Sequence, residues 1–374
     1  MKVAIVLNTS WNVYNFRMGL IKALQSNGIA VTVIAPKDRY SEKLIENDCE
    51  YIEVKMDSRG VNPIKDLALV AELYGIYKRI KPDVILHYTI KPNIYGTIAA
   101  SLLRIPVINN VCGLGTVFLK DSVFSRIAIL MYRFAFKFPK LIFFQNDDDR
   151  KLFSKKKIIR KTAVETLPGS GIDLSRFSPA PFKRNERFTF LLVSRLIHDK
   201  GIIEYIDAVK KLKANGFQGK FQLLGAKDPK HKRGIPEEVI NEWLENNVIE
   251  YLGTTDDVRP FIKDADCVVL PSYREGTPRT LLEAASVAKP IVATDVPGCN
   301  NVVKDDFNGF LCQLRDSDDL ANKMFKMASL QDQQLERFGN NGRKLVESKF
   351  DENIVVSKYL QAISDIKLNS KSLN

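Results

Sequence analysis

The sequence predicts an α/β fold made of two doubly wound parallel-sheet domains. Short apolar runs of strand length alternate with amphipathic helical patterns along nearly all of the 374 residues, and this alternation is typical of parallel sheets that carry helices on both faces. A chain of this length can bury two hydrophobic cores. Between the halves, residues 178–181 (SPAP) are followed by charged residues and indicate a hinge.

The expected strands form two series. In the first half they are residues 2–7, 30–35, 50–54, 83–87, 105–109, 140–144 and 163–166. In the second half they are residues 188–193, 220–224, 248–252, 266–270 and 290–293. Helical patterns such as residues 63–80 separate them, and Asp351 with the two residues after it can cap a last helix to about Lys367. We therefore expect domains at residues 1–178 and 179–350, followed by a C-terminal helix within residues 351–374.

Composition narrows the class of protein. The chain is 45% hydrophobic and 27% charged, as a globular protein is. The apolar run at residues 2–7 is too short for a signal peptide, and no stretch reaches the roughly 18 uncharged apolar residues of a membrane-spanning helix. The five cysteines are scattered without metal-ligand spacing, which favours a reducing cytoplasm over a disulfide framework.

Positive charge is concentrated in the first half. The formal net charge is +12, and residues 1–180 hold 27 Lys and Arg against 16 Asp and Glu, whereas the remainder holds 29 against 28. Nucleic acid, an anionic membrane surface or a phosphate-bearing acceptor would each match such an excess. No helix-turn-helix, zinc-finger or aromatic RNA-binding pattern accompanies the charge, so we do not expect a nucleic-acid partner.

Residues 124–144 give the membrane interpretation its local support. This stretch mixes aromatic and aliphatic residues with Arg126, Arg133, Lys137 and Lys140, the composition of an interfacial basic helix followed by a strand. A core helix with a solvated basic edge would show the same composition, because a buried helix also needs apolar residues. Both interpretations stay open at this point.

Two glutamates carry the main functional pattern. Glu275 lies in a Gly/Pro loop after the apolar strand at residues 266–270, and Glu283 lies eight positions later, roughly two turns into the following helix. The amides at a helix N-terminus suit a phosphate or a sugar hydroxyl, and a carboxylate further along can accept hydrogen bonds from a ribose diol. The spacing therefore predicts one ligand with a sugar at one end and a ribose at the other.

This Glu-x7-Glu arrangement resembles that of the retaining glycosyltransferases of family 4. The matching segments are VSRL at 193–196 with KG at 200–201, TDVPG at 294–298 with NG at 308–309, and, typical of the branch that assembles capsular and lipid-linked polysaccharides, YTIKPN at 88–93, GLG at 113–115 and PGSGID at 168–173. The resemblance covers about residues 2 to 366. It implies the GT-B architecture, two Rossmann-like domains facing across a cleft, with the donor on the C-terminal domain and the acceptor on the N-terminal one. It also implies that the helix at 351–374 crosses back to the first domain.

Arg195 and Lys200 are the expected counter-charges for the donor diphosphate. Arg195 follows the strand at 188–193, and Lys200 lies at the entry of the next helix, where ligands sit in open parallel sheets. Two cations there would neutralise a leaving group whose charge grows as the glycosidic bond breaks. A solvated surface pair is the alternative for these two residues taken alone, and His198 between them either helps to bind phosphate or is an exposed loop residue.

We expect Glu275, Arg195 and Lys200 to be the catalytic residues. The resemblance assigns the donor-sugar hydroxyls to Glu275 and the ribose to Glu283, and residues 276–278 (Gly276, Thr277 and Pro278) would bring backbone amides near sugar and phosphate, although Pro278 has no N–H. The alternatives are that Glu275 only favours the helix dipole and that Glu283 only pairs with a neighbouring cation. In the glycosyltransferase family that this chain resembles, the leaving phosphate takes the acceptor's proton, so no protein nucleophile is required.

No metal or other cofactor is expected. Residues 147–149 form an Asp-Asp-Asp run that contains the Asp-x-Asp pattern of metal-dependent transferases, but acids also suit the helix start indicated by the residues that follow. Arg195 and Lys200 already supply the positive charge that a metal would bring.

The acceptor side carries weaker patterns. Asn15 and Arg17 lie where the first strand leads into the first helix, and Lys91, Gly113 and Gly115 follow other strands of the same sheet. Together with the basic charge they favour an anionic, lipid-linked acceptor.

Two positions complicate the acceptor side. Many relatives have a histidine just before the GLG loop, where this chain has Cys112. His87 ends a strand, where it either reaches the cleft or is structural.

The sequence thus predicts a retaining, metal-independent transferase that moves a hexose or N-acetylhexosamine from a nucleotide diphosphate sugar, expected to be a UDP-sugar, to a polyprenyl-diphosphate-linked saccharide. We expect it in the cytoplasm, peripherally associated with the membrane. The alternatives are a GT-B enzyme with a soluble small-molecule acceptor, a nucleotide-sugar epimerase, and a non-catalytic basic protein that binds membrane or nucleic acid. The intact Arg, Lys and Glu-x7-Glu set argues against the last.

Overall fold

The computed structural model describes residues 1–57, 62–113, 123–179, 181–229 and 231–371. They divide into two compact units. The first comprises Met1–Gly171 together with the chain from Glu352 onward, and the second comprises Ile172–Asp351. Ser178 and Pro179, where we expected the hinge, therefore belong to the second unit.

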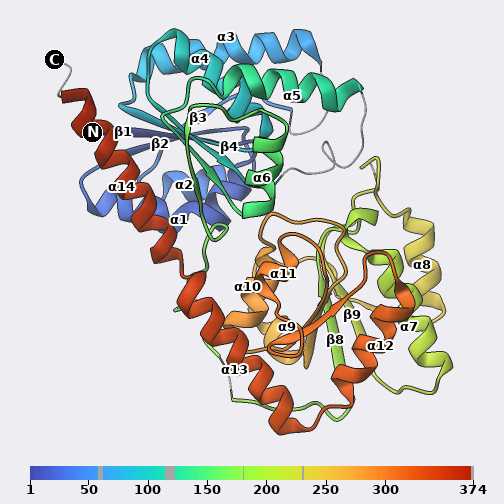
Figure 1. The fold of residues 1–374 in the computed structure, drawn as a ribbon. Helices are drawn as coiled ribbons and strands as arrows, with labels where there is room; N and C mark the ends of the chain where they lie inside the picture. The colour runs from blue at the N-terminus through green and yellow to red at the C-terminus, as the bar shows by residue number, and fades with distance from the viewer. Residues whose placement is uncertain (58–61, 114–122, 180, 230, 372–374) are drawn as a thin grey trace. The chain divides into compact units, whose positions relative to one another are not determined.

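The first unit is built on a seven-stranded parallel sheet (Figure 1). Its strands lie in the order β3-β2-β1-β4-β5-β6-β7. Successive strands are added on one side of β1 up to β3 and on the other side from β4 onward, so the strand order switches between β1 and β4. The strands are β1 Lys2–Val6, β2 Ala30–Ala35, β3 Glu50–Glu53, β4 Val84–Tyr88, β5 Val107–Val111, β6 Leu141–Phe144 and β7 Ala163–Thr166. In such sheets ligands bind outside the carboxyl ends of the strands.

Alternating side chains of β1 enter two different cores. Val3 and Ile5 pack with α1 Ser10–Ser26 and α2 Ser41–Ile45, whereas Ala4 and Val6 pack with α3 Pro63–Ile80 and the helices that follow it. The helices on this second face are η1 Pro92–Gly96, α4 Thr97–Leu102, α5 Val123–Ala135 and α6 Asp147–Lys155. The two helical layers are visible on either side of the sheet in Figure 1.

Side-chain caps fix where several helices of the first unit begin. Thr9 accepts a hydrogen bond from Asn12 N at the start of α1, and Asn62 caps α3, whose first residue is Pro63. Asn146 caps α6, so the three aspartates at 147–149 occupy the first turn of that helix. The run predicted as a helix start is confirmed as one.

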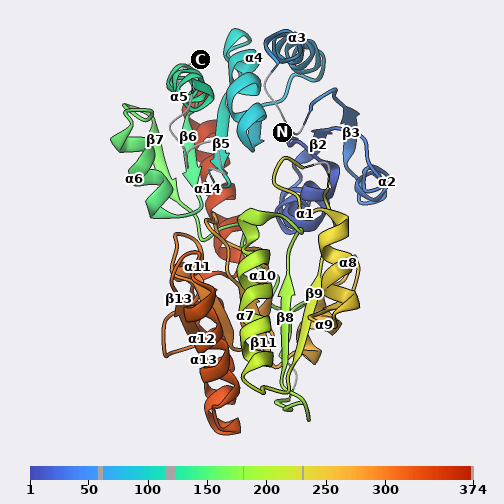
Figure 2. The same ribbon diagram turned by 90° about the vertical axis from the view of Figure 1, so that its right-hand side faces the viewer.

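The last helix, α14 Glu352–Lys371, belongs to the first unit although it follows the second in sequence. Val355, Tyr359 and Ile363 are buried with residues of α1 and β1, and α14 runs beside α1 in both views (Figures 1 and 2). Tyr359 accepts a 2.6 Å hydrogen bond from Asn110 Nδ2 at the end of β5. Helix α14 therefore forms part of the core of the first unit.

The second unit is built on a six-stranded parallel sheet in the order β10-β9-β8-β11-β12-β13. Its strands are β8 Thr189–Val193, β9 Lys220–Leu224, β10 Glu250–Tyr251, β11 Cys267–Leu270, β12 Ile291–Thr294 and β13 Gly309–Cys312. Its helices are η3 His198–Lys200, α7 Ile202–Ala214, α8 Glu237–Glu245, α9 Arg259–Asp264, α10 Arg279–Ser286, α11 Cys299–Val302, α12 Ser317–Ala328 and α13 Asp332–Lys349.

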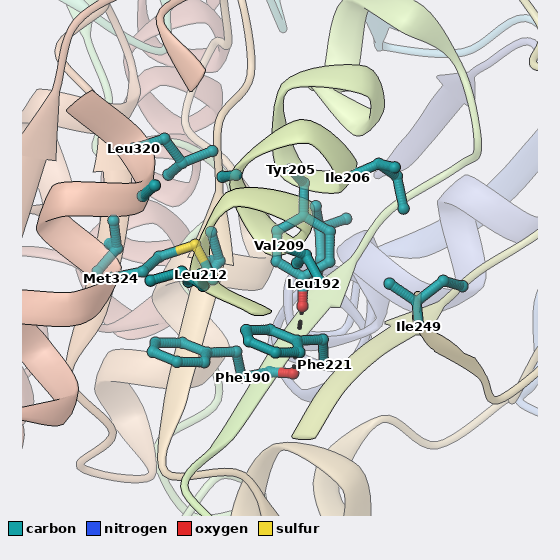
Figure 3. Packing of buried hydrophobic residues seen from close by; sticks show 14 of the residues in the cluster. Phe190, Leu192, Tyr205, Ile206, Val209, Leu212, Phe221, Ile249, Leu320 and Met324 are labelled. Carbon is teal, nitrogen blue, oxygen red and sulfur yellow. Dashed lines mark hydrogen bonds between the residues drawn. The ribbon is translucent and has the colours of Figure 1, made fainter. Parts of the chain in front are cut away.

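Strand β8 divides its side chains between two cores in the same way as β1. Phe190 and Leu192 pack against α7 and α12, as Figure 3 shows, and the ring of Phe190 stacks on Phe221 of β9 with centroids 5.7 Å apart. Leu191 and Val193 pack on the other face with residues of α10 and α13. The strand that precedes Arg195 is therefore fixed from both sides.

The strand predictions differ from the structure by more than one residue in three places. The run expected at residues 105–109 forms β5 two residues later, and the run at 248–252 contributes only the two residues of β10. Strand β13 was not predicted, because a four-residue strand that starts with a glycine shows little periodicity. It pairs with β12 at the edge of the sheet.

Candidate active site

The chain leaving β8 places Arg195 at the carboxyl edge of the second sheet. Gly225, which follows β9, has φ +148° and lies so close that a Cβ there would be 1.8 Å from the carbonyl oxygen of Ser194. Arg195 Nη1 lies 3.7 Å from Asp228 Oδ2, and its side chain is 52% exposed. The guanidinium is therefore oriented by a carboxylate while most of its surface remains accessible.

Lys200 is brought to the loop after β11 by the glycine that follows it. Gly201 has φ +70°, and a Cβ at this position would lie 2.0 Å from the carbonyl oxygen of Pro271. The Nζ of Lys200 donates a hydrogen bond to Oε1 of Glu275. The structure therefore joins two of the three predicted catalytic residues in an ion pair, with the two side chains 23% and 13% exposed.

Glu275 is held by contacts to both its carboxylate and its backbone. Ser272 Oγ donates a 2.7 Å hydrogen bond to the same Oε1 that Lys200 contacts. The amide of Glu275 donates to Pro297 O at 3.2 Å, and Gly298, at φ +90°, leaves no room for a Cβ beside the backbone of Glu275. Because Oε1 has these two donors, Oε2 is the oxygen of this carboxylate that neither of them occupies.

Glu283 is the fifth residue of α10, which begins at Arg279. It therefore lies about one turn into the helix, and the expectation of two turns is wrong because the loop continues through Pro278. Arg279 Nε donates a 3.2 Å hydrogen bond to Glu283 Oε1, so the pairing with a neighbouring cation also occurs. Burial raises the pKa of Glu283, and the Arg279 guanidinium opposes that shift.

Residues 276–278 connect the two glutamates. Gly276 and Pro278 are buried and Thr277 is partly exposed. The Pro278 carbonyl accepts the amides of Leu281 and Leu282, at 3.1 and 3.3 Å, which starts the helix. The first-turn amides of α10 thus follow directly on the loop that carries Glu275.

Several charged and aromatic residues around this site were not predicted. Asp199, between His198 and Lys200, forms a 2.5 Å ion pair with Arg233. Tyr273 donates a 2.6 Å hydrogen bond to Glu204, and the guanidinium of Arg315 lies 4.4 Å from its ring centroid. Of the unpredicted residues, only Arg279 had a readable signal, its i,i+4 spacing to Glu283.

The first unit buries Arg17, one of the residues proposed for the acceptor side. Arg17 is 5% exposed, and its guanidinium lies 4.4 Å from the ring centroid of Tyr88 and 3.6 Å from the Cys112 sulfur. Burial raises the pKa of the Cys112 thiol, which donates to Asn110 Oδ1 at 3.1 Å. Arg17 Nε and Thr89 Oγ1 are buried without a hydrogen-bond partner in the described part of the chain.

The remaining acceptor candidates are spread along the first unit. Lys91 forms a 2.7 Å ion pair with Asp66 and is mostly buried. Asn15 donates to the Trp11 carbonyl within α1 at 2.9 Å. Gly113 follows β5 with φ +111°, whereas Gly115 lies outside the described residues.

His87 is a structural residue of the first core. Its side chain is completely buried, with Nε2 2.9 Å from Tyr77 Oη and Nδ1 3.2 Å from Asn109 Oδ1. Burial lowers the pKa of His87 to about 3, so the ring stays neutral at physiological pH. Of the two interpretations given above, the structural one holds.

Among the described residues, no group of three or more His, Cys, Asp or Glu side chains is placed to hold a metal ion. Asp147 instead pairs with Arg150 at 3.1 Å and accepts from Thr166 Oγ1 at 2.7 Å. No described helix is long and apolar enough to cross a bilayer. The five cysteines are all free thiols.

Two family models match the chain. Residues 175–345, which contain the whole site of the second unit, match glycosyl transferases group 1, and residues 2–146 match the glycosyl transferase 4-like model. The chain is a glycosyltransferase with a glycosyl transferase 4-like part and a group 1 part. The resemblance inferred from the Glu-x7-Glu pattern is thereby confirmed.

Curated relatives of this glycosyltransferase have specific acceptors in their names. It is 26% identical, over 96% of its own length and 98% of the relative's, to N,N'-diacetylbacillosaminyl-diphospho-undecaprenol alpha-1,3-N-acetylgalactosaminyltransferase of Campylobacter jejuni. It is 28% identical to UDP-Gal:alpha-D-GlcNAc-diphosphoundecaprenol alpha-1,3-galactosyltransferase of Escherichia coli, over 83% of this chain and 81% of that one.

Solved structures share the fold of the glycosyltransferase. HepE of Anabaena, solved in complex with UDP and glucose, matches with a TM-score of 0.80 over 97% of this chain and 99% of its own, at 19% identity. At that identity the likeness establishes the two-domain GT-B fold alone. The α/β fold class expected from the sequence is therefore confirmed.

Proposed function

We propose that this glycosyltransferase moves a hexose or N-acetylhexosamine from a UDP-sugar to a polyprenyl-diphosphate-linked saccharide, with retention at the anomeric carbon and without a metal ion. The Lys200–Glu275 pair at the carboxyl edge of the second sheet, with Arg195 after the neighbouring strand, is the observation that carries the proposal. The named activities of the two relatives, both on undecaprenyl-diphosphate-linked sugars, support the choice of acceptor.

In the proposed reaction the donor diphosphate lies against Arg195 and Lys200. As the bond between the anomeric carbon and the phosphate oxygen breaks, negative charge grows on the diphosphate, and two fixed cations stabilise it. The acceptor oxygen bonds to the anomeric carbon, and its proton passes to the departing phosphate oxygen. Neither step needs a protein nucleophile, which agrees with Glu275 being paired with Lys200 and hydrogen-bonded by Ser272.

The two glutamates have separate tasks in this proposal. Glu275, whose Oε1 is occupied by Lys200 and Ser272, would accept donor-sugar hydroxyls through Oε2. Glu283, whose Oε1 accepts from Arg279 Nε, would accept the ribose hydroxyls. Amides from residues 276–278 and the first turn of α10 would face the sugar and phosphates between them. On the first unit, Asn15, Arg17, Lys91 and Gly113 remain the proposed acceptor residues.

A transfer assay tests the proposal. We expect calorimetry to show binding of UDP-sugars in preference to ADP- and GDP-sugars, and mass analysis to show one added sugar on undecaprenyl-diphosphate-linked mono- or disaccharides. EDTA should leave the rate unchanged. Transfer only to water-soluble glycosides would favour the soluble-acceptor alternative, and conversion of the UDP-sugar without acceptor would favour an epimerase. Absence of all nucleotide-sugar binding would overturn the assignment of a donor site.

We also propose that helix α5 docks the enzyme on anionic lipid. Its inner face is in the core, with Tyr132 and Ala135 buried, so the core-helix interpretation is correct for this side. The opposite side forms what we term the α5 surface, large apolar side chains that are between 42% and 60% exposed: Ile127, Leu130, Phe134 and Phe138. An exposed apolar row of this kind is typical of a helix that lies in a membrane interface.

The charges beside the α5 surface favour an anionic membrane as its partner. Arg126, Lys137 and Lys140 are exposed, and no acidic residue occurs from 122 to 146. Lys137 Nζ lies 5.8 Å from the Phe134 ring centroid. Arg133, which we had included among the surface cations, instead donates to the Lys156 carbonyl at 2.6 and 3.1 Å and supports the end of α6.

We expect vesicle sedimentation to show binding to anionic liposomes, weaker binding to neutral ones, and release by high salt. Each basic residue near such a surface contributes about 1 kcal/mol, so Lys137→Gln with Lys140→Gln should weaken binding by roughly thirtyfold. Leu130→Ser with Phe134→Ser should weaken it through lost apolar burial.

The control for this experiment is Ile64→Ser with Leu67→Ser, which removes two side chains on α3 that are 82% and 72% exposed. It should leave binding unchanged. Equal loss in the control, or equal binding to neutral and anionic vesicles, would return α5 to a purely structural role.

A further inference from the structure

The first unit contains a cavity that the proposed donor chemistry does not use. Its volume is about 450 Å³, within the range of small-molecule sites. The loop after β2, the chain that follows β3 and the first turns of α3 surround it, and Lys91 after β4 completes it. It therefore lies at the carboxyl edge of the sheet, where parallel sheets bind their ligands.

The floor of the cavity is apolar and rigid. Val54, Met56 and Leu69 line it and are buried. Beside them Asp66, itself 3% exposed, accepts hydrogen bonds from Lys91 Nζ at 2.7 Å and from Tyr95 Oη at 2.9 Å. A buried carboxylate with two donors is fixed in position, so the floor keeps its shape.

The charges that line the cavity balance. Four ammonium groups face four carboxylates: Lys37, Lys55, Lys65 and Lys91 against Glu53, Asp57, Asp66 and Glu72. A diphosphate, with at least two negative charges, would gain little from a neutral lining. An uncharged polar ligand therefore matches this cavity better than a diphosphate does.

Part of this lining is paired and part is available. Lys65 pairs with Asp57 at 3.0 Å, as Lys91 does with Asp66. Within the described residues, the side chains of Lys37, Lys55 and Glu53 have no hydrogen-bond or ion-pair partner. The rim can therefore both donate to and accept from a ligand, above an apolar floor. A sugar ring requires this combination, since its hydroxyls donate and accept and its C–H face is apolar.

We propose that this cavity binds one uncharged sugar residue of the acceptor glycan. The ring would lie on Val54, Met56 and Leu69, with hydroxyls bonded to Lys55 and Glu53 at the rim. The inference rests on the proposed function, because it takes the acceptor to be a saccharide. It also gives Lys91 a task other than a phosphate contact, because its ammonium group holds Asp66 in place beside the cavity floor.

The first test is direct binding of the methyl glycosides of glucose, galactose, N-acetylglucosamine and N-acetylgalactosamine, measured by saturation-transfer NMR without donor. We expect wild type to bind at least one of them. Glu53→Gln with Lys55→Gln should weaken that binding by at least tenfold, the effect of losing charge-assisted hydrogen bonds. Ala68→Trp, which fills the cavity from an exposed position of α3, should do the same without changing charge.

The matched control is Lys22→Gln with Glu46→Gln, which removes the same two charges from exposed positions of the first unit outside the cavity. It should bind like wild type. No glycoside binding by wild type, or equal loss in the control, would overturn the subsite.

A second test uses turnover. With a lipid-linked acceptor, we expect the KM for the acceptor to be about tenfold higher in Glu53→Gln with Lys55→Gln than in wild type, and the KM for the UDP-sugar to be unchanged. An unchanged acceptor KM would overturn the subsite while transfer by wild type stands. If wild type binds a glycoside but transfers no sugar, the subsite is supported and the proposed function is refuted. The two failures can therefore be told apart.

Discussion

Replacing Lys200 with alanine should lower kcat/KM for sugar transfer by about 10²- to 10³-fold, which corresponds to roughly 3 to 4 kcal/mol of lost transition-state stabilisation. Lys200 is partly buried and fixed by Glu275 and by the tight approach of Gly201 to Pro271. A cation held in this way stabilises the leaving diphosphate without reorganisation, which a mobile surface lysine cannot do. Steady-state kinetics with the UDP-sugar identified by calorimetry measures the loss.

The substitution has a second consequence that must be separated from the first. Without Lys200, Glu275 retains Ser272 as a partner but loses its counter-charge. The double variant Lys200→Ala with Glu275→Gln removes the unpaired charge, so recovery of the rate in it would assign the damage to Glu275. If Lys200 acts on the diphosphate, the double variant is slower than Glu275→Gln alone by about the factor that Lys200→Ala costs in the wild type.

Two single variants serve as a control and a comparison for Lys200→Ala. Lys211→Ala breaks an exposed ion pair with Asp318 in the same unit and should change the rate less than threefold. Arg195→Ala removes a largely exposed guanidinium that is 3.7 Å from Asp228, so a loss of roughly 2 to 4 kcal/mol there would report contact with the diphosphate. Turnover within threefold of wild type for both Lys200→Ala and Arg195→Ala would refute the diphosphate role.

The sequence predicted the backbone of the site well because short strands bring a few residues to one edge. Once β8 and β11 were recognised as buried apolar runs, the residues that follow them had to meet at the carboxyl edge of a parallel sheet. The pattern of strands was therefore enough to place Arg195, Lys200 and Glu275 at the same edge of the sheet. The helix after the loop was misplaced by about one turn, because a Pro inside a loop gives a poor boundary.

The contacts that orient these side chains could not be predicted from the sequence. Nothing in the pattern indicates that Ser272 donates to Glu275 or that Asp228 faces Arg195, since both depend on how loops from different strands pack. The same limit applies to Arg133, which looked like a surface cation but binds the carbonyl of Lys156. The cavity beside Asp66 combines residues from three loops and a helix, so spacing alone could not predict it.

The two glutamates should separate nucleotide binding from sugar transfer. Glu283→Ala should weaken binding of UDP itself by about ten- to a hundredfold, the effect of losing hydrogen bonds to a charged group, and weaken the UDP-sugar equally. Glu275→Gln should leave UDP affinity within about twofold and lower kcat instead, because its proposed partner is the sugar. Calorimetry with UDP and with the UDP-sugar measures both affinities.

The internal pairing of Glu283 requires a control, since its loss leaves Arg279 without a carboxylate. Arg343 and Glu347 on α13 form another i,i+4 pair in the same unit, with 2.6 Å between Nε and Oε1. Glu347→Ala should not alter UDP affinity, whereas loss of an i,i+4 pair as such would act equally in both variants. Equal weakening of UDP by Glu283→Ala and Glu275→Gln would show that the two carboxylates share one task, and the assignment of ribose and sugar to opposite ends of the loop would be wrong.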